Sequence, residues 1–317
     1  MSRIRWFAAA MAMAALAATA GCAAKLPDDP TPAPQLVIYD RAWAYQSMPG
    51  QEILTPHYRI FTTHTDPVYI QRVPQFLENA LVHYQRMVKP VCKPDKPMEI
   101  YIFGQRNQWE HFTTEMTGPA ASIYLKIQEG GYVDNGRAVL YDIKRMNTFA
   151  VTGHEAWHQY LWHYVKHRPP PWLDEGIACY FEKFDCEGST IDFEPRQNLT
   201  RLSMLRFGLG NHTWVELPEL LSTHPGNIIG GSAGKVATYY AELWALILFL
   251  QDDPASKAKF ATLLADVGTQ RMMEQAVHAG FTGQQSDFGP AIFRAYITTD
   301  LAAFSTRFQA YCTKLAF

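Results

Sequence analysis

The stretch Thr148–Tyr164, TFAVTGHEAWHQYLWHY, places two histidines four residues apart, with a glutamate directly after the first. In an α-helix, residues four apart differ by about 40° around the axis, so His154 and His158 project from one face. Two imidazoles so placed can bind one Zn²⁺ through their ring nitrogens. Glu155 is about 100° further round the helix, where a general base could take the proton of a zinc-activated water. The stretch therefore predicts a catalytic zinc helix.

The alternative is a helix that carries its histidines by chance. Because the chain has 11 His in 317 residues, a chance match to His-Glu-x-x-His is on the order of one or two per cent. His163 and His167 are also four apart, but no glutamate follows His163. We expect these two to be solvated surface histidines. The motif alone does not settle the question, and a third zinc ligand is needed.

A candidate third ligand lies downstream, in the segment PPPWLDEGIACYFEKF at 169–184. Its three prolines are expected to end the first helix and to let a second begin near Leu173. Glu175 then falls in the first turn of a helix that returns beside the first, and Gly176 would let the two helices approach closely. The plain alternative is that Asp174 and Glu175 only complement a helix N-terminus. Asp174 is the next candidate for the ligand.

His-Glu-x-x-His-Gln followed by Trp-Leu-x-Glu-Gly-x-Ala resembles the gluzincin metallopeptidases, the clan of thermolysin-like proteases and zinc aminopeptidases. The layout is similar to bacterial secreted proteins of the peptidase MA-like type. The resemblance implies that Glu175 is the third zinc ligand and that the chain hydrolyses peptide bonds. Thermolysin-like enzymes carry an aspartate four residues after that glutamate, where this chain has Cys179. The groups that support the histidines must therefore differ.

The resemblance extends to two further segments. TYYAELWALILFL (Thr238–Leu250) resembles an aminopeptidase segment whose tyrosine assists the oxyanion, which implies Tyr240, or Tyr239 as the alternative, although Leu243 stands where glycine is expected. Core packing of both tyrosines is the other interpretation. The predicted strand RAVLY at 137–141 lies where gluzincins hold an extended substrate by strand addition. No aminopeptidase-type Gly-x-Met-Glu-Asn motif is found there, which favours an endopeptidase.

The pattern along the chain predicts an α+β fold. YRIFTT at 58–63 and MEIYIF at 98–103 alternate as strands do, and a helical pattern lies between them at 69–88. Asp-Asn-Gly at 134–136 predicts a hairpin turn. We expect a small N-terminal α/β half with a mixed sheet at about 55–146, followed by a zincin-like, mainly α-helical half at about 147–317. Together they would form one peptidase domain from 38 to 317.

The N-terminus reads as an export signal. Arg3 and Arg5 precede an apolar run, and small residues lead to Gly21 and Cys22, which predicts a signal peptide at 1–21. The end of this segment resembles a bacterial lipobox with Cys22 as the lipid-modified residue, although Thr19 departs from it. Residues 22–37 are rich in proline and predict an extended tether. We expect a lipoprotein anchored to the outer membrane and facing the periplasm, with a periplasmic or secreted protein as the alternative.

Besides Cys22, four cysteines remain after export, at 92, 179, 186 and 312. In an oxidising compartment they allow three pairings. Cys179 and Cys186 are close enough in the chain to close a small loop, which leaves Cys92 with Cys312. Buried free thiols are the alternative.

The net charge and the distribution of basic residues bear on which classes of partner are expected. The formal net charge is -2 and we see no basic stripe, so a nucleic-acid partner is not expected. The sequence favours a zinc metallopeptidase that acts on a peptide or protein substrate, with His154, His158 and Glu175 as ligands and Glu155 as the base. The alternative is a non-catalytic envelope lipoprotein that uses a zincin fold as a binding or scaffolding module.

Overall fold

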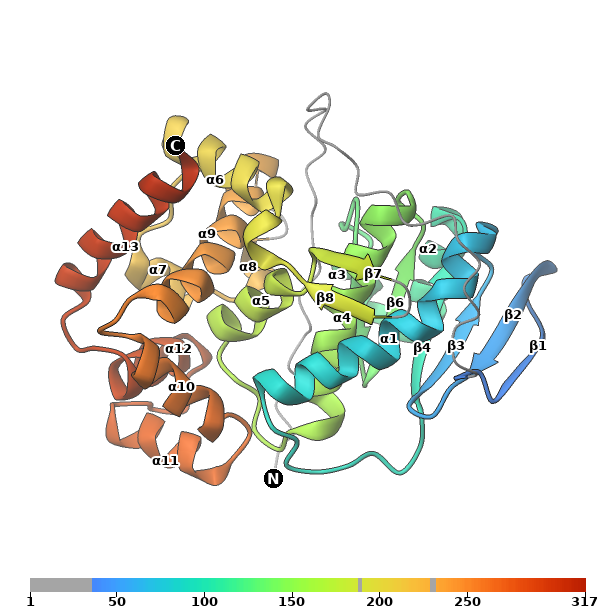
Figure 1. The fold of residues 1–317 in the computed structure, drawn as a ribbon, viewed down its shortest axis with the longest axis horizontal. Coiled ribbons are helices and arrows are strands. Elements are labelled where there is room, and N and C mark those ends of the chain that lie inside the picture. Colours follow the sequence, from blue (N-terminus) through green and yellow to red (C-terminus); the bar gives the residue numbers. More distant parts are fainter. Residues whose placement is uncertain (1–35, 188–189, 229–231) are drawn as a thin grey trace.

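The computed structural model describes residues 36–187, 190–228 and 232–317, and within them the fold is α+β, as predicted. A six-stranded mixed sheet forms the N-terminal half and helices dominate the rest (Figure 1). The predicted signal peptide, the lipidation site at Cys22 and nearly all of the tether lie outside the described residues.

The sheet combines parallel and antiparallel pairs. Its order is β1 (Tyr39–Tyr45), β2 (Met48–Leu54), β3 (Tyr58–Thr62), β4 (Met98–Phe103), β6 (Arg137–Tyr141) and β5 (Gly131–Asp134). The pairs β3–β4 and β4–β6 are parallel, and the other three are antiparallel. The predicted strands at 58, 98 and 137 are confirmed. So is the hairpin turn, in which Asn135 and Gly136 both have positive φ.

The hairpin β1–β2 was not predicted, so the sheet begins at residue 39 rather than near 55. Pro49 and Gly50 lie inside β2 and hide its strand character. Gly50 is nevertheless required where it is, because a Cβ there would stand 2.2 Å from the carbonyl oxygen of Thr62 and 3.2 Å from the Trp43 ring. Tertiary packing therefore overrides a weak local pattern.

Helices cover both faces of the sheet (Figure 1). On one side α1 (Pro67–Met87) and α4 (Arg145–Tyr164) pack against side chains such as Ile60 and Ile100. On the other side α2 (Arg106–Thr117) contributes Trp109 to a smaller cluster with Phe103 and Val139. Successive strand residues point to opposite faces, so the alternation in MEIYIF supplies both cores.

The C-terminal half is mainly helical. Its helices are α5 (Pro171–Tyr180), α6 (Leu199–Gly210), α7 (Leu217–Ser222), α8 (Pro225–Ile228), α9 (Ala233–Asp252), α10 (Lys257–Asp266), α11 (Gln270–His278), α12 (Gln285–Tyr296) and α13 (Leu301–Ala316). A short hairpin of β7 (Phe184–Glu187) and β8 (Thr190–Phe193) was not predicted. A four-residue helix, α3 (Ala121–Tyr124), and 3₁₀ turns at Gly118–Ala120 and Pro195–Gln197 complete the fold.

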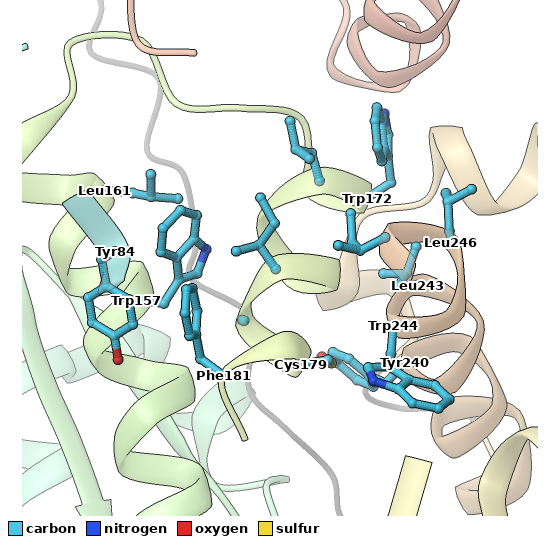
Figure 2. Packing of buried hydrophobic residues seen from close by; sticks show 14 of the residues in the cluster. Tyr84, Trp157, Leu161, Trp172, Cys179, Phe181, Tyr240, Leu243, Trp244 and Leu246 are labelled. Carbon is cyan, nitrogen blue, oxygen red and sulfur yellow. The ribbon is translucent and has the colours of Figure 1, made fainter. Parts of the chain in front are cut away.

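Helix α9 is the centre of the helical half. It is long and apolar enough to cross a membrane by length and composition, yet 83% of that apolar window is buried inside the protein. Helix α5 lies against it and also contacts α4, and Figure 2 shows the side chains that fill the space between the three helices. This packing fits a core helix.

The close approach at Gly176 is to a different helix from the expected one. A Cβ on Gly176 would lie 2.7 Å from Ile247 Cγ1 and 2.9 Å from the carbonyl oxygen of Leu243, both on α9. The prolines allow a second helix to begin close to Leu173, as predicted, but they do not end the first one. Helix α4 ends at Tyr164, before them, and Pro171 is the first residue of α5. Proline suits that position because its missing N–H would have no helical partner there.

The expected disulfides are absent, because the cysteines at 92, 179, 186 and 312 are all free. The thiol of Cys92 donates to the carbonyl oxygen of His163 near the end of α4, whereas Cys312 is buried on α13. Cys179 is buried on α5 and Cys186 lies in β7. Buried free thiols, the alternative interpretation, therefore describe Cys179 and Cys312.

Candidate metal centre

The structure brings His154 and His158 of α4 together with Glu175 of α5. Glu175 Oε2 lies 3.4 Å from His154 Nε2 and 3.5 Å from His158 Nε2. Both histidines are fully buried, and Glu175 is 3% exposed. Helical spacing aligns the two imidazoles, and the turn between the helices returns the carboxylate to face them.

The three converging atoms, His154 Nε2, His158 Nε2 and Glu175 Oε2, are buried without a hydrogen-bond partner. A buried polar atom without a partner costs about 1–3 kcal/mol. A cation between them would satisfy all three lone pairs at once. These residues therefore fit a metal ion, and this group could bind one.

Asp174 supports His158 from behind. Its Oδ1 accepts a hydrogen bond from His158 Nδ1 at 2.7 Å, and its Oδ2 accepts one from Arg168 at 2.6 Å. Because a carboxylate only accepts, Nδ1 carries the proton and Nε2 keeps its lone pair for a metal. Asp174, the reserve candidate for the third ligand, thus lies on the side of the ring that faces away from the converging atoms.

Glu182 supports His154 in the same way. His154 Nδ1 donates to Glu182 Oε1 at 3.0 Å, and Arg201 of α6 contacts both carboxylate oxygens, at 2.5 Å and 2.8 Å. Neither Glu182 nor Arg201 was predicted from the sequence to have this role. Glu182 lies seven residues after Glu175 in the quoted segment, and that spacing was the only available signal. No feature of the sequence around Arg201 indicates that it supports His154 through Glu182.

A second group of possible ligands shares His154. His154, Cys179 and Glu182 offer atoms within 4.8 Å of one another, so this group could also bind a metal ion. Burial raises the pKa of the Cys179 thiol well above its usual value, and the thiolate is the form that binds metals. The oxygens of Glu182 already accept hydrogen bonds from His154, Arg201 and Asn198. The group with Glu175 is therefore the better metal site.

Glu155 of α4 lies beside this centre, close enough to interact electrostatically with His154 and His158. Both of its oxygens are buried without a hydrogen-bond partner. Burial raises its pKa to about 7, although the nearby histidines act in the opposite direction. A Cβ on Gly131 of β5 would lie 2.8 Å from Glu155 Cγ, so Glu155 is directly next to that strand. A pKa near neutrality suits a group that takes up and releases protons.

The charges at the centre favour protonated histidines when no cation is bound. Burial lowers the pKa of His154, but the adjacent carboxylates of Glu175 and Glu182 outweigh it and raise the pKa. Burial also acts against the charged form of His158, but the carboxylates of Asp174 and Glu175 raise its pKa well above the usual value. A metal ion must displace these protons, so its affinity falls at acid pH.

Tyr240 lies closer to the centre than its neighbour. Its ring centroid is 6.5 Å from that of His154, and the guanidinium of Arg201 lies over the ring at 5.4 Å. Figure 2 shows Tyr240 extending from α9 towards the part of α5 that carries Cys179. The hydroxyl of Tyr239 instead donates to the carbonyl oxygen of Thr223. Both tyrosines are fully buried, as the core-packing interpretation also expects.

Two predictions near the centre are wrong. RAVLY forms β6, which lies between β4 and β5, so it cannot accept a further strand. The edge strand is β5, because the hairpin turn folds it to the outside. His163 is half-buried and its Nε2 bonds to the carbonyl oxygen of Gly136 at 2.9 Å, so it is not a solvated histidine.

Comparison with known proteins adds no family. No protein-family model matches the chain, and no curated protein matches it.

Proposed function

We propose that this protein is a zinc metallopeptidase of the gluzincin type, in which His154, His158 and Glu175 hold one zinc ion. One observation carries the proposal: three buried, unpartnered ligand atoms converge beside a fourth side chain, Glu155, whose carboxylate is also unpartnered. Two imidazoles and a carboxylate are a donor set of catalytic zinc sites, in which the fourth position stays open. Zinc is favoured over magnesium and calcium because those ions prefer oxygen ligands.

When bound, the ion would act as a Lewis acid on water and on the scissile carbonyl. Glu155 accepts the proton of the attacking water and then donates it to the leaving amine. Both of its carboxylate oxygens are free of hydrogen bonds within the protein, which supports a role in both transfers. Tyr240 assists the negative charge that develops on the carbonyl oxygen, a role that its place beside His154 supports.

The substrate is a peptide or protein segment in extended form. Among the residues that the structure describes, β5 lies at an edge of the sheet, so its outward-facing backbone N–H and C=O groups pair with no other strand there. An extended peptide can pair with such an edge. Gly131 of β5 and the adjacent Glu155 side chain would then place the peptide backbone beside the base. No group that marks a free N-terminus was found in the sequence, which favours endopeptidase activity.

The test is Glu155→Gln, which keeps the size of the side chain but cannot take up a proton at neutral pH. Peptide-library cleavage, followed by mass spectrometry, should fall by about 10²–10⁴-fold, since general-base assistance has that magnitude. Zinc content should be unchanged, because Glu155 is not a ligand. Glu274→Gln on exposed α11 is the matched control. Full activity in Glu155→Gln would contradict the proposal.

The second candidate is a non-catalytic binding or scaffolding module. The burial of all four central side chains favours it, because structural zinc sites are closed and catalytic sites must admit substrate. A wild-type protein that contains zinc but cleaves nothing in a broad peptide screen would support this candidate. For both candidates we propose export and a lipid anchor at Cys22, on the sequence alone.

A further inference from the structure

We infer that Arg201 decides which side of His154 a metal ion occupies, because it keeps Glu182 as a hydrogen-bond acceptor and prevents it from becoming a ligand. The inference rests on the proposed metal site. It assigns to Arg201 a positioning role that acts through Glu182, without contact between Arg201 and the ion.

The imidazole of His154 lies between two sets of possible ligands. Its Nε2 faces Glu175 at 3.4 Å, and its Nδ1 faces Glu182 at 3.0 Å. The Nδ1 side also has Cys179, whose sulfur lies within 4.8 Å of the candidate atoms of His154 and Glu182. An imidazole, a thiolate and a carboxylate are all good zinc ligands. Ligand chemistry alone therefore does not direct the ion to the Nε2 side.

The two sides differ in how many lone pairs are free. Glu182 Oε1 accepts from His154 and Arg201, and Oε2 accepts from Arg201 and Asn198, at 2.5–3.0 Å. A carboxylate offers about four acceptor positions, so that of Glu182 is fully used. Glu175 Oε2 has no hydrogen-bond partner. The free lone pairs are thus on the Nε2 side.

The charge of Arg201 also favours a metal ion on the Nε2 side of His154. The side chains of Arg201 and Glu182 are only 2% and 4% exposed, so solvent screens their charges weakly. The planar guanidinium matches the carboxylate with two parallel bonds. Its positive charge repels a cation from the group formed by His154, Cys179 and Glu182. Without Arg201, Glu182 would have free lone pairs and an unbalanced buried charge, next to a thiol.

Arg168 provides a matched comparison on the other histidine. It bonds to Asp174, which supports His158, but the pair is about 10% exposed and forms no possible ligand group with a cysteine. Loss of Arg168 should weaken metal binding without creating an alternative site. Only Arg201 should control the choice between two sites.

The experiment is a Co²⁺ titration of the folded, metal-free protein, read by visible and near-ultraviolet absorption. The wild type should bind Co²⁺ without a thiolate-to-cobalt charge-transfer band. Arg201→Met should lower the affinity of the original site by about 10–100-fold, the usual effect of losing such support, and should show the band. The band should disappear in Arg201→Met/Cys179→Ala, and Arg168→Met should lack it.

Wild-type affinity and spectrum in Arg201→Met would overturn the inference. If that variant does not fold, Glu182→Gln/Arg201→Met removes both charges together and leaves no unbalanced ion. This double variant lacks the competing Glu182 carboxylate, so it should bind Co²⁺ without the charge-transfer band, and the appearance of the band would overturn the inference. A wild type that binds Co²⁺ but cleaves no peptide contradicts the peptidase alone, because none of these measurements uses a substrate. A wild type that binds no metal contradicts both.

Discussion

Glu242 is a buried carboxyl that the proposed chemistry does not use. It lies on α9, where Oε1 accepts a hydrogen bond from the backbone N–H of Val215 at 2.9 Å and Oε2 has no partner. Burial raises its pKa well above the usual value. The folded protein therefore holds a proton at Glu242 at a pH where the unfolded chain has released it.

Because the folded protein holds this additional proton, we expect Glu242→Gln to change how stability depends on pH. Stability falls with rising pH wherever the folded state binds more protons, so the wild type should lose stability above about pH 4.5, the range in which an unfolded glutamate ionises. Glutamine does not ionise, so Glu242→Gln should not lose stability in this way as the pH rises. Its Tm should equal that of the wild type near pH 4 and exceed it by a few degrees at pH 8, roughly 1 kcal/mol.

Thermal unfolding monitored by circular dichroism checks this prediction, with Glu274→Gln as the exposed control that should follow the wild type at every pH. A constant difference between Glu242→Gln and the wild type across the pH range would show that ionisation of Glu242 does not affect folding.

At the scale of single residues, the sequence identified the centre but not its supports. His154, Glu155 and His158 belong to one local motif, and Glu175 follows in a second one. Arg201 supports His154 from a different helix, where the sequence has no feature that distinguishes one arginine from another. Glu242 was missed for the same reason, since an acidic residue in an apolar helix gives no indication of which way it points.

The contact between α5 and α9 depends on Gly176, which has no side chain. Replacing a helical glycine by alanine stabilises an isolated helix by up to about 1 kcal/mol. Here the added Cβ would lie 2.7 Å from Ile247 Cγ1 and 2.9 Å from the carbonyl oxygen of Leu243. The backbone oxygen cannot move without shifting α9, so α5 must move instead.

We therefore expect Gly176→Ala to lower the free energy of unfolding by about 1–3 kcal/mol, the usual cost of overpacking a core. It should also reduce zinc affinity, because Glu175 is the preceding residue. Urea unfolding and zinc titration measure the two effects. Gly210→Ala, at the end of α6 with nothing within 4 Å of its Cβ position, is the control and should be neutral or stabilising. Equal stability in both variants would contradict this account of the packing.

Elements with a strong pattern were predicted and those with a weak one were not. β3, β4, β6, α1 and α4 have clear hydrophobic periodicity. The hairpin β1–β2 contains Pro49 and Gly50, and β7–β8 is short and carries acidic residues, so neither has a clear pattern. We expected the substrate to pair with β6, but β5 lies at the edge of the sheet. Which of the two strands is outermost depends on the direction in which the hairpin folds back. Local sequence does not specify that direction.

In the molecule as a whole, the candidate metal centre lies where the two halves meet. Helix α4 packs on the sheet and α5 packs on α9, so an ion held by His154, His158 and Glu175 would connect them. Ligands that bind only the folded state stabilise it by mass action. Removal of the metal should therefore affect the stability of the entire chain.

We expect zinc to raise Tm by several degrees relative to protein treated with a chelator. At a free zinc concentration 100-fold above Kd the stabilisation is about 2.7 kcal/mol, and each kcal/mol corresponds to roughly 2–4 °C in a protein of this size class. Differential scanning calorimetry is the measurement. Alanine at His154, His158 or Glu175 should abolish the zinc effect, and full zinc occupancy in Glu175→Ala would show that the third ligand is misassigned.

The proximity of the site residues along the chain also affects folding speed. The proposed ligands, the base and both supporting carboxylates lie within residues 154–182. Closing a loop of this length costs little entropy compared with joining distant strands, and contacts at short sequence separation form early. The centre can thus assemble as soon as α4 and α5 meet, before the parallel strands have found their partners. A cation captured at that stage would act as a folding nucleus, and Arg201, which comes later in the chain, would then complete its surroundings.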